Sequence, residues 1–399
     1  MPLTIDNMND LSIPFASFRS RLPEVGTTIF STMSALAARH QAVNLGQGFP
    51  DFDCDPTLLD AVDRAMRDGH NQYPPMSGVP ALRQAVAEKI ATLYGATYDA
   101  ESEITITAGA TQALLTAMLC CLHPGDEVIV IEPAFDSYLP AIALAGARAL
   151  TVPMHYDGSS FCVAWERVAE AVSPRTRLIL INTPHNPTGS ILSDADMQSL
   201  AAIVAGTDIL ILSDEVYEHM VYDGAAHASV ARYPDLAARS MVVGSFGKTF
   251  HVTGWKVGYV AAPAWLTAEF RKVHQFNVFT VNTPMQYALA HYLENPRPYL
   301  ALSSFYQAKR DLFRDRLASS RLRLLPSCGT YFQCADFSAV SSRDDAEFAR
   351  WLTTDVGVAA IPLSAFYREP RSAPSGIIRF CFAKKDATLL SAVNKLLTV

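Results

Sequence analysis

Between residues 100 and 263, short apolar runs alternate with stretches in which apolar residues recur at helical spacing. Most of these runs are apolar on both faces, which is typical of strands buried in a parallel sheet. The pattern therefore predicts an α/β fold, with a mostly parallel seven-stranded sheet flanked by helices. The expected strands are Ile104–Ala108, Val128–Glu132, Ala149–Pro153, Leu178–Asn182, Ile209–Asp214, Met241–Ser245 and Gly258–Ala262. The expected helices are Thr111–Leu122, Trp165–Ala171 and Asp194–Val204.

After Pro263 the apolar pattern changes to longer helical stretches with few strands, which predicts a second, smaller α+β domain. The expected elements there are helices over Ala264–Val273, Gln286–Leu293, Tyr299–Ala318 and Asp344–Asp355, a strand over Thr330–Phe337 and a closing strand over Ile377–Phe382. We expect residues 1–45, with one helix over Thr28–His40, to form an arm that packs on the small domain. Residues 46–290 would then form the large domain and residues 291–399 the small domain.

Composition narrows the classes of partner. The chain has 399 residues, half of them hydrophobic, and a net charge of −7 without runs of like charge. This argues against nucleic acid or an anionic membrane as the main partner. No apolar run is long enough to span a membrane and no secretory signal pattern opens the chain. Seven cysteines without a Cys-x-x-Cys pair favour a reduced, cytoplasmic protein, and the ten histidines show no metal-binding spacing.

Residues that could take part in ligand binding or catalysis follow five of the expected strands. In open α/β sheets, ligands bind outside the carboxyl ends of the strands, so these residues are expected to share one site. They are Ala110 and Thr111 after the first strand, Phe135 after the second, Asn182 and Asn186 after the fourth, Asp214 and Tyr217 after the fifth, and Ser245 and Lys248 after the sixth. Each has an ordinary alternative when taken singly: a helix cap, a turn, core packing or a solvated surface charge.

Lys248, Asp214 and Tyr217 together indicate pyridoxal phosphate chemistry. The cofactor's aldehyde needs an amine, and its ring nitrogen needs a carboxylate that keeps it protonated. Two common nucleotide motifs do not explain the chain. The Gly-Lys-Thr triplet at 247–249 lacks the glycine that a phosphate-binding loop requires at position 242, and Asp51 replaces the third glycine of a dinucleotide fingerprint beginning at Gly46.

Four motifs together resemble the class I/II aminotransferases of pyridoxal phosphate fold type I. They are Gly-Ala-Thr-Gln at 109–112, Asn-Pro-Thr-Gly at 186–189, Ser-Asp-Glu-Val-Tyr at 213–217 and Ser-Phe-Gly-Lys-Thr-Phe at 245–250. The stretch Asn44–Phe52 resembles the kynurenine/glutamine transaminase branch, and within it the bacterial methionine aminotransferases. The resemblance covers nearly the whole chain, with the motifs in the family's order.

The resemblance implies a role for each matching residue. Lys248 would form the internal aldimine with pyridoxal 5′-phosphate and act as general base. Asp214 would pair with the ring nitrogen, Tyr217 and Asn186 would bond the ring hydroxyl, and Phe135 would stack on the ring. The phosphate would be held by Ala110, Thr111, Ser245 and Lys256, joined by Tyr73 from the neighbouring subunit of a homodimer. Arg379 would clamp the substrate carboxylate, with Gly46 and Asn182 assisting, and His185 receives no role.

Substrate choice and rival functions stay open in the sequence. The stretch Val273–Pro296, expected to line the pocket from the partner subunit, has no Lys or Arg, which favours methionine, aromatic or other large neutral amino acids over aspartate. Aromatic residues there and in the arm fit such a pocket: Phe276, Phe279, Tyr287, Phe15, Phe18 and Phe30.

The alternative functions are a cysteine-S-conjugate β-lyase with the same site, a transcription regulator built on an aminotransferase domain, and a binding protein without activity. Such regulators carry an N-terminal winged-helix module, whereas the stretch before the first site motif here is short and acidic rather than basic. A binding protein would not need Lys248, Asp214 and Arg379 together.

Overall fold

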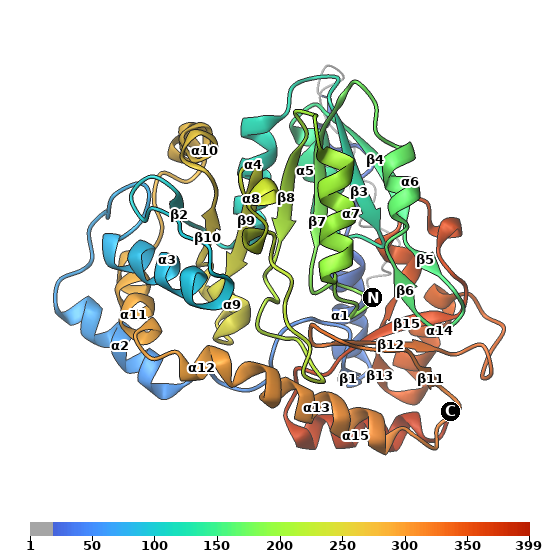
Figure 1. Cartoon of the computed structure of the whole chain (residues 1–399). Coiled ribbons are helices and arrows are strands. Elements are labelled where there is room, and N and C mark those ends of the chain that lie inside the picture. The colour runs from blue at the N-terminus through green and yellow to red at the C-terminus, as the bar shows by residue number, and fades with distance from the viewer. Residues whose placement is uncertain (1–18) are drawn as a thin grey trace.

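The computed structural model describes residues 19–399, and a large mixed sheet lies at its centre (Figure 1). Its seven strands run in the order β2-β10-β9-β8-β7-β3-β4, and only β10 is antiparallel to its neighbours. The strands are β2 (Ile104–Thr107), β3 (Glu127–Glu132), β4 (Arg148–Pro153), β7 (Thr176–Asn182), β8 (Leu210–Asp214), β9 (Ser240–Ser245) and β10 (Gly258–Ala261). The sequence-based prediction of a mostly parallel seven-stranded sheet is thus confirmed.

Helices cover both faces of this sheet because side chains alternate along each strand. Leu212 of β8 packs in a core with α4 (Ala110–Cys121), α5 (Tyr138–Leu144) and α10 (Ala264–Asn277). Its neighbour Ile211 joins the larger core on the opposite face. The helices contributing to that core include α2 (Pro56–Arg67), α3 (Pro80–Tyr94), α6 (Trp165–Glu170), α7 (Asp194–Val204), α8 (Pro234–Ala237) and α11 (Thr283–Leu293).

A smaller antiparallel sheet lies below the large one in the view of Figure 1. Its strands are, in order, β11 (Arg323–Leu324), β12 (Phe332–Asp336), β15 (Ile377–Cys381) and β14 (Ile361–Pro362). The helices beside it are α13 (Leu302–Arg316), α14 (Asp345–Trp351) and α15 (Asp386–Leu396). Helix α1 (Ile29–Arg39) packs here, and β1 (Val43–Asn44) pairs with β13 (Val358–Ala359). The domain limits at residues 45 and 290 remain a prediction.

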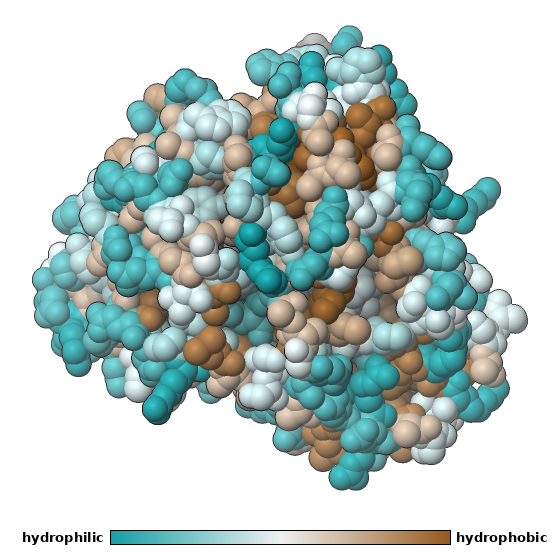
Figure 2. All heavy atoms as spheres, in the orientation of Figure 1, coloured by the Kyte–Doolittle hydropathy of each residue, from teal (hydrophilic) through white to brown (hydrophobic). Residues whose placement is uncertain are grey.

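Short elements complete the chain. They are hairpin strands β5 (His155–Tyr156) and β6 (Phe161–Cys162), helices α9 (Phe246–Thr249) and α12 (Arg297–Leu300), 3₁₀ turns at Val230–Arg232, Thr253–Trp255, Leu363–Phe366 and Pro370–Ser372, and a π-helical turn at Leu352–Val356. No helix within residues 19–399 is long and apolar enough to cross a membrane. On the face drawn in Figure 2, hydrophobic residues form small separate areas among hydrophilic ones.

Two details of the predicted small domain were wrong. The single helix expected over Tyr299–Ala318 is divided into α12 and α13. Ala301, which lies between them, has a ψ of −8°, far from the ψ of about −42° in an α-helix. The strand expected to close the chain is followed by α15, whose apolar face is buried. Both errors concern the periphery and leave the placement of β15 unchanged.

Candidate active site

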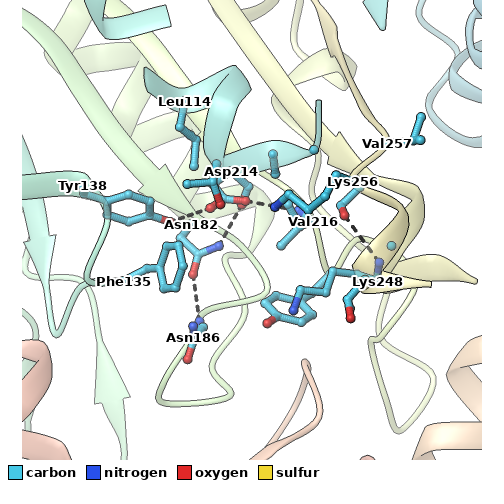
Figure 3. Close-up of a pocket in the computed structure, with 17 residues that line it drawn as sticks. Leu114, Phe135, Tyr138, Asn182, Asn186, Asp214, Val216, Lys248, Lys256 and Val257 are labelled. Carbon is cyan, nitrogen blue, oxygen red and sulfur yellow. Dashed lines mark hydrogen bonds between the residues drawn. The ribbon is translucent and has the colours of Figure 1, made fainter. Parts of the chain in front are cut away.

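A cavity of about 150 Å³ opens at the carboxyl ends of β7, β8 and β9 (Figure 3). Ten of the residues that the sequence singled out line it: Ala110, Thr111, Phe135, Asn182, Asn186, Asp214, Tyr217, Ser245, Lys248 and Lys256. The rule that parallel strands present ligand sites at their carboxyl ends explains the convergence. Arg379, Gly46 and Tyr73 do not line this cavity and are placed differently.

One end of the cavity is built to hold an anion. Helix α4 begins at Ala110 with no side chain capping its first amides, and Gly109 turns into it with φ 77°. The Cβ of any other residue at 109 would lie 3.3 Å from Nζ of Lys256, so glycine permits the lysine to approach the helix start. Lys256 adopts a left-handed φ of 55°, which is uncommon for lysine. Free amides, the positive end of the helix dipole and an ammonium group together favour a phosphate.

The centre of the cavity contains a buried carboxylate. Tyr138 donates a 2.6 Å hydrogen bond to Oδ2 of Asp214, and the amide of Val216 donates to Oδ1 at 3.3 Å. Burial raises the pKa of Asp214 to about 6, against the lowering effect of these hydrogen bonds. In Figure 3, Tyr138 reaches Asp214 from the side of Phe135, whose ring meets the Tyr138 ring edge-on at 5.7 Å. Such a carboxylate is poised to accept a cationic N–H group.

Lys248 contributes an amine to the cavity. Burial lowers the pKa of its ammonium group to about 8, so about a tenth of the amine is neutral at pH 7. Its Nζ donates to the Tyr331 hydroxyl at 2.9 Å and to the Gly48 carbonyl at 3.3 Å. Both partners are uncharged, and Nζ lies 5.7 Å from the centre of the Tyr217 ring. A desolvated lysine of this kind is suited to bond a carbonyl carbon.

Arg379 lies beside the cavity, on β15 of the small sheet, and is only 1% exposed. Its Nη1 donates to Oδ1 of Asn186 at 2.7 Å and its Nη2 to the Gly46 carbonyl at 2.9 Å. Its Nε has no hydrogen-bond partner among the described residues, although it is buried. A buried guanidinium with a free donor is suited to bind a carboxylate.

Asn182 contacts other groups than the sequence led us to expect. Its Nδ2 donates to the Asp214 carbonyl at 2.9 Å, and its Oδ1 accepts from the Asn186 amide at 2.8 Å. The structure thus brings Asn186 and Gly46 to Arg379, whereas Asn182 joins the ends of β7 and β8. A direct contact of Asn182 with substrate stays a prediction.

A family model described as aminotransferase class I and II matches residues 40–396. The chain belongs to this family. Methionine aminotransferase of Escherichia coli is 52% identical over 379 residues, which cover 95% of this aminotransferase and 97% of the relative. The probable N-succinyldiaminopimelate aminotransferase of Mycobacterium tuberculosis is 41% identical and covers 94% and 97% of the two chains. Human kynurenine–oxoglutarate transaminase 1 is 35% identical and covers 90% and 93%.

Solved structures agree with this assignment. An Escherichia coli protein described as having a methionine aminotransferase function superposes with a TM-score of 0.93 at 51% identity, covering 96% of this aminotransferase and 99% of that chain. N-succinyldiaminopimelate aminotransferase from Mycobacterium tuberculosis superposes with a TM-score of 0.91 at 41% identity, covering 96% and 100%. The fold is therefore that of the type I enzymes dependent on pyridoxal 5′-phosphate, as the sequence predicted.

The cavity of this aminotransferase fits pyridoxal 5′-phosphate, the cofactor of the family. The uncapped α4 start and Lys256 match a phosphate, and buried Asp214 matches a protonated ring nitrogen. Lys248 would supply the amine that the aldehyde requires. Among residues 19–399, no cluster of three or more His, Cys, Asp or Glu side chains could hold a metal ion.

Tyr73 and His185 lie apart from these groups. Tyr73 is 79% exposed, and its ring meets that of Phe279 edge-on at 5.3 Å, away from its own chain's cavity. Buried His185 shares a 2.8 Å hydrogen bond with the Thr188 hydroxyl. Burial lowers the pKa of His185 to about 4, so the ring is neutral and supports the turn that carries Asn186.

Sequence reasoning missed Tyr138 and Tyr331, although both phenols contact the central groups. Tyr138 follows Phe135 by three residues, and its amide donates to the Phe135 carbonyl at 3.1 Å, so one turn carries both rings to the cavity. Their proximity in the sequence was a usable signal. Tyr331 comes 83 residues after Lys248, and nothing near it in sequence links it to the site.

Proposed function

We propose that this aminotransferase transfers the amino group of methionine, or of another L-amino acid with an aromatic or large neutral side chain, to a 2-oxo acid. The observation that carries the reaction is the convergence of Lys248, Asp214 and the anion site on one cavity with Arg379 beside it. The 52% identity to Escherichia coli methionine aminotransferase supports methionine as the amino donor.

The residue roles follow from the chemistry of the bound cofactor, whose protonated ring accepts the electron pair left when the substrate's Cα proton departs. Lys248 would take that proton and deliver it to the C4′ carbon of the cofactor. Asp214 would hold the ring nitrogen in its protonated form, Phe135 would stack on the ring, and Tyr217 and Asn186 would bond its hydroxyl. Ala110, Thr111, Ser245 and Lys256 would hold the phosphate, and Arg379 would fix the substrate carboxylate.

Aromatic rings near Arg379 support a neutral substrate side chain. The guanidinium carbon lies 3.8 Å from the centre of the Phe332 ring, 4.9 Å from Phe366 and 5.4 Å from Phe30. An apolar side chain would pack well there, whereas a second carboxylate would need a second cation. Phe15 and Phe18, which the sequence also suggested, lie outside the described residues.

We also propose that the enzyme is a homodimer with shared active sites. Tyr73, Phe276 and Phe279 are 79, 86 and 45% exposed, which is unusual for large aromatic residues on a monomer. In such a dimer, Tyr73 would reach the phosphate in the partner subunit.

Cysteines that form no disulfide support a location in the cytoplasm.

Spectroscopy tests the proposed reaction. Purified protein loaded with pyridoxal 5′-phosphate should show the yellow band of lysine-bound cofactor. Methionine alone should bleach that band, and a 2-oxo acid should restore it. A Lys248→Ala variant should lack the band. A kinetic preference for aspartate over methionine would contradict the substrate assignment, and a protein that never shows the band would contradict the activity.

The alternative is a kynurenine or glutamine transaminase that also cleaves cysteine S-conjugates. The 35% identity to human kynurenine–oxoglutarate transaminase 1 favours it to a lesser degree. Both reactions begin with removal of the Cα proton, and a leaving group on Cβ decides between them. Assays of pyruvate release from a cysteine S-conjugate and of kynurenine transamination, each compared with methionine turnover, distinguish the two.

A further inference from the structure

Two groups from distant parts of the chain meet at the Lys248 amine. Tyr331 precedes β12 of the small sheet, Gly48 follows β1, and Lys248 lies in α9 at the end of β9. The Tyr331 hydroxyl donates to the Gly48 carbonyl at 2.7 Å, so its oxygen is free to accept the N–H of Lys248 at 2.9 Å. Lys248 also donates to the same carbonyl at 3.3 Å.

We propose that Tyr331 and the Gly48 carbonyl hold the Lys248 amine in a fixed position whenever it is not bonded to cofactor, with its lone pair free to act as the base. This inference rests on the proposed function, because it takes Lys248 as the cofactor-bonding lysine. A neutral amine has two N–H groups, and both are used by these acceptors. The remaining tetrahedral position is the lone pair, which a proton acceptor needs.

The backbone around Tyr331 is strained, which points to a demand on the position of its side chain. Thr330 has a φ of 64°, a left-handed conformation that is rare for a β-branched residue. Its neighbours retain it: the Thr330 amide donates to the Met220 carbonyl at 3.0 Å, and the Tyr222 hydroxyl donates to the Thr330 carbonyl. Strain of this kind persists where the surroundings over-determine the backbone, often at functional sites.

Close packing also fixes the acceptor carbonyl. A Cβ on Gly48 would lie 2.7 Å from the Phe332 ring, so this glycine is pressed against the residue that follows Tyr331. The phenol and the carbonyl therefore cannot separate without displacing the start of β12. Two rigid acceptors at one amine restrict its position, as proton transfer at a defined carbon requires.

The ionisation of Lys248 gives the inference a measurable consequence. The titratable groups that influence it, besides Tyr331, are Cys381, Asp214, Arg379, Lys256 and Tyr217. Burial is the largest influence and lowers the pKa of Lys248. The phenol oxygen accepts an N–H bond that is stronger from an ammonium than from an amine, so it favours the charged form. Removing this oxygen should lower the pKa further.

The experiment compares Tyr331→Phe with Tyr306→Phe in the full-length, cofactor-free protein. Tyr306 is a matched control because its ring lies 5.6 Å from that of Tyr331, while its buried hydroxyl has no hydrogen-bond partner among the described residues. The rate at which added pyridoxal 5′-phosphate bonds Lys248 is measured against pH. For Tyr331→Phe we expect the midpoint to fall by about one pH unit, on the order of a tenfold change in the acid dissociation constant. Tyr306→Phe should titrate like the unmodified protein.

A second readout uses the loaded enzyme. Tyr331→Phe should lower kcat for methionine on the order of tenfold and leave KM nearly unchanged, because Tyr331 holds the base and does not bind the substrate carboxylate. A Tyr331→Phe midpoint equal to that of the unmodified protein overturns the inference. A fluorinated tyrosine at position 331, a weaker acceptor of the same shape, covers the case in which Tyr331→Phe does not fold: a smaller shift in the same direction supports the inference, and no shift overturns it.

Failure of the proposed function gives a different result. If the unmodified protein never bonds pyridoxal 5′-phosphate, or if Lys248→Ala bonds it equally well, then Lys248 is not the cofactor-bonding lysine. If the unmodified protein bonds the cofactor and only the effect of Tyr331→Phe is missing, then the proposed function is retained and the proposed role of Tyr331 is rejected.

Discussion

Two lysines, each near an acid, lie in different surroundings: Lys89 packs between α3 and the large sheet, and Lys248 lies just after the carboxyl end of β9. Lys89 of α3 contacts Glu218 directly and donates to the Tyr259 hydroxyl at 2.9 Å, and Tyr94 donates to the second Glu218 oxygen at 2.5 Å. In contrast, Lys248 makes its hydrogen bonds to uncharged groups, and Asp214 accepts from a phenol and an amide. The first pair is internally satisfied, and the second is not.

The pKa values of the two acids show the consequence. Burial opposes ionisation of Glu218, yet Lys89 and the neighbouring hydrogen bonds hold its pKa below the usual value. Burial dominates at Asp214, whose pKa rises, and at Lys248, whose pKa falls. Acids only four residues apart thus serve different ends. Glu218 and Lys89 neutralise each other and stabilise the fold. Asp214 and Lys248 keep donor and acceptor capacity that a ligand can use.

The largest expected effect separates the lysines by activity. Lys248→Ala should reduce methionine transamination by about 10⁴-fold, because it removes both the cofactor bond and the base. The variant should remain as stable as the unmodified protein, since no buried charge loses its only partner. Steady-state kinetics and thermal unfolding measure the two properties. A variant that loses its folded structure along with activity would place Lys248 with Lys89 as a structural residue.

The next effect separates the acids by stability. Glu218→Gln leaves Lys89 buried without a counter-charge, which should cost about 3–5 kcal/mol of unfolding free energy. The activity per folded molecule should change little, because the pair lies on the α3 side of the sheet. Denaturant unfolding combined with active-site titration tests this. Near-normal stability would show that the Lys89 cluster tolerates an unpaired charge and would remove the contrast.

Asp214→Asn should have an effect of opposite sign on stability. Because folding raises the pKa of Asp214 to about 6, its protonated form is favoured in the fold, and the stability it contributes below about pH 4 is lost as pH rises through 6. In the cofactor-free protein, asparagine should therefore increase stability at about pH 8 by up to about 3 kcal/mol, and by little at about pH 4. Activity should still fall. Equal unfolding free energies at about pH 8 would contradict the unsatisfied state of Asp214.

Tyr138→Phe should have the smallest effect. Its hydroxyl lowers the pKa of Asp214, so removing it should raise that pKa and weaken cofactor binding about tenfold. Titration of the cofactor-free protein with pyridoxal 5′-phosphate measures the change. Tyr98→Phe is the control, since its buried hydroxyl has no partner among the described residues. Equal affinity for both variants would mean that the Tyr138 bond does not orient the carboxylate.

The sequence predicted the parts of this contrast that are local along the chain. Asn182 and Asp214 end β7 and β8, and Lys248 lies three residues after β9, so the apolar runs placed these residues correctly at one edge of the sheet. Helices α2 and α3 were missed, although Asp55-Pro56 and Val79-Pro80 mark their starts in the manner typical of proline in a first helical turn.

Long-range partners were beyond such reasoning. Lys89 meets Glu218 across 129 residues, and Lys248 meets Gly48 across 200. A single sequence contains no periodicity that relates positions so far apart. The packing of α3 against the large sheet brings the first pair together, and the path of the chain after β1 brings Gly48 to Lys248. The sequence likewise could not show that Tyr73 is exposed and lies outside its own chain's cavity.

The internal bonds of Arg379 have a consequence for selectivity against common metabolites. Asn186 and Gly46 each accept one N–H of the guanidinium and hold it in place, and the remaining N–H groups, including that of Nε, are left for a ligand carboxylate. A ligand that is also held through its amino group gains a second attachment, while a bare acid binds through Arg379 alone. We therefore expect the enzyme to be poorly inhibited by simple carboxylate buffers and by free fatty acids.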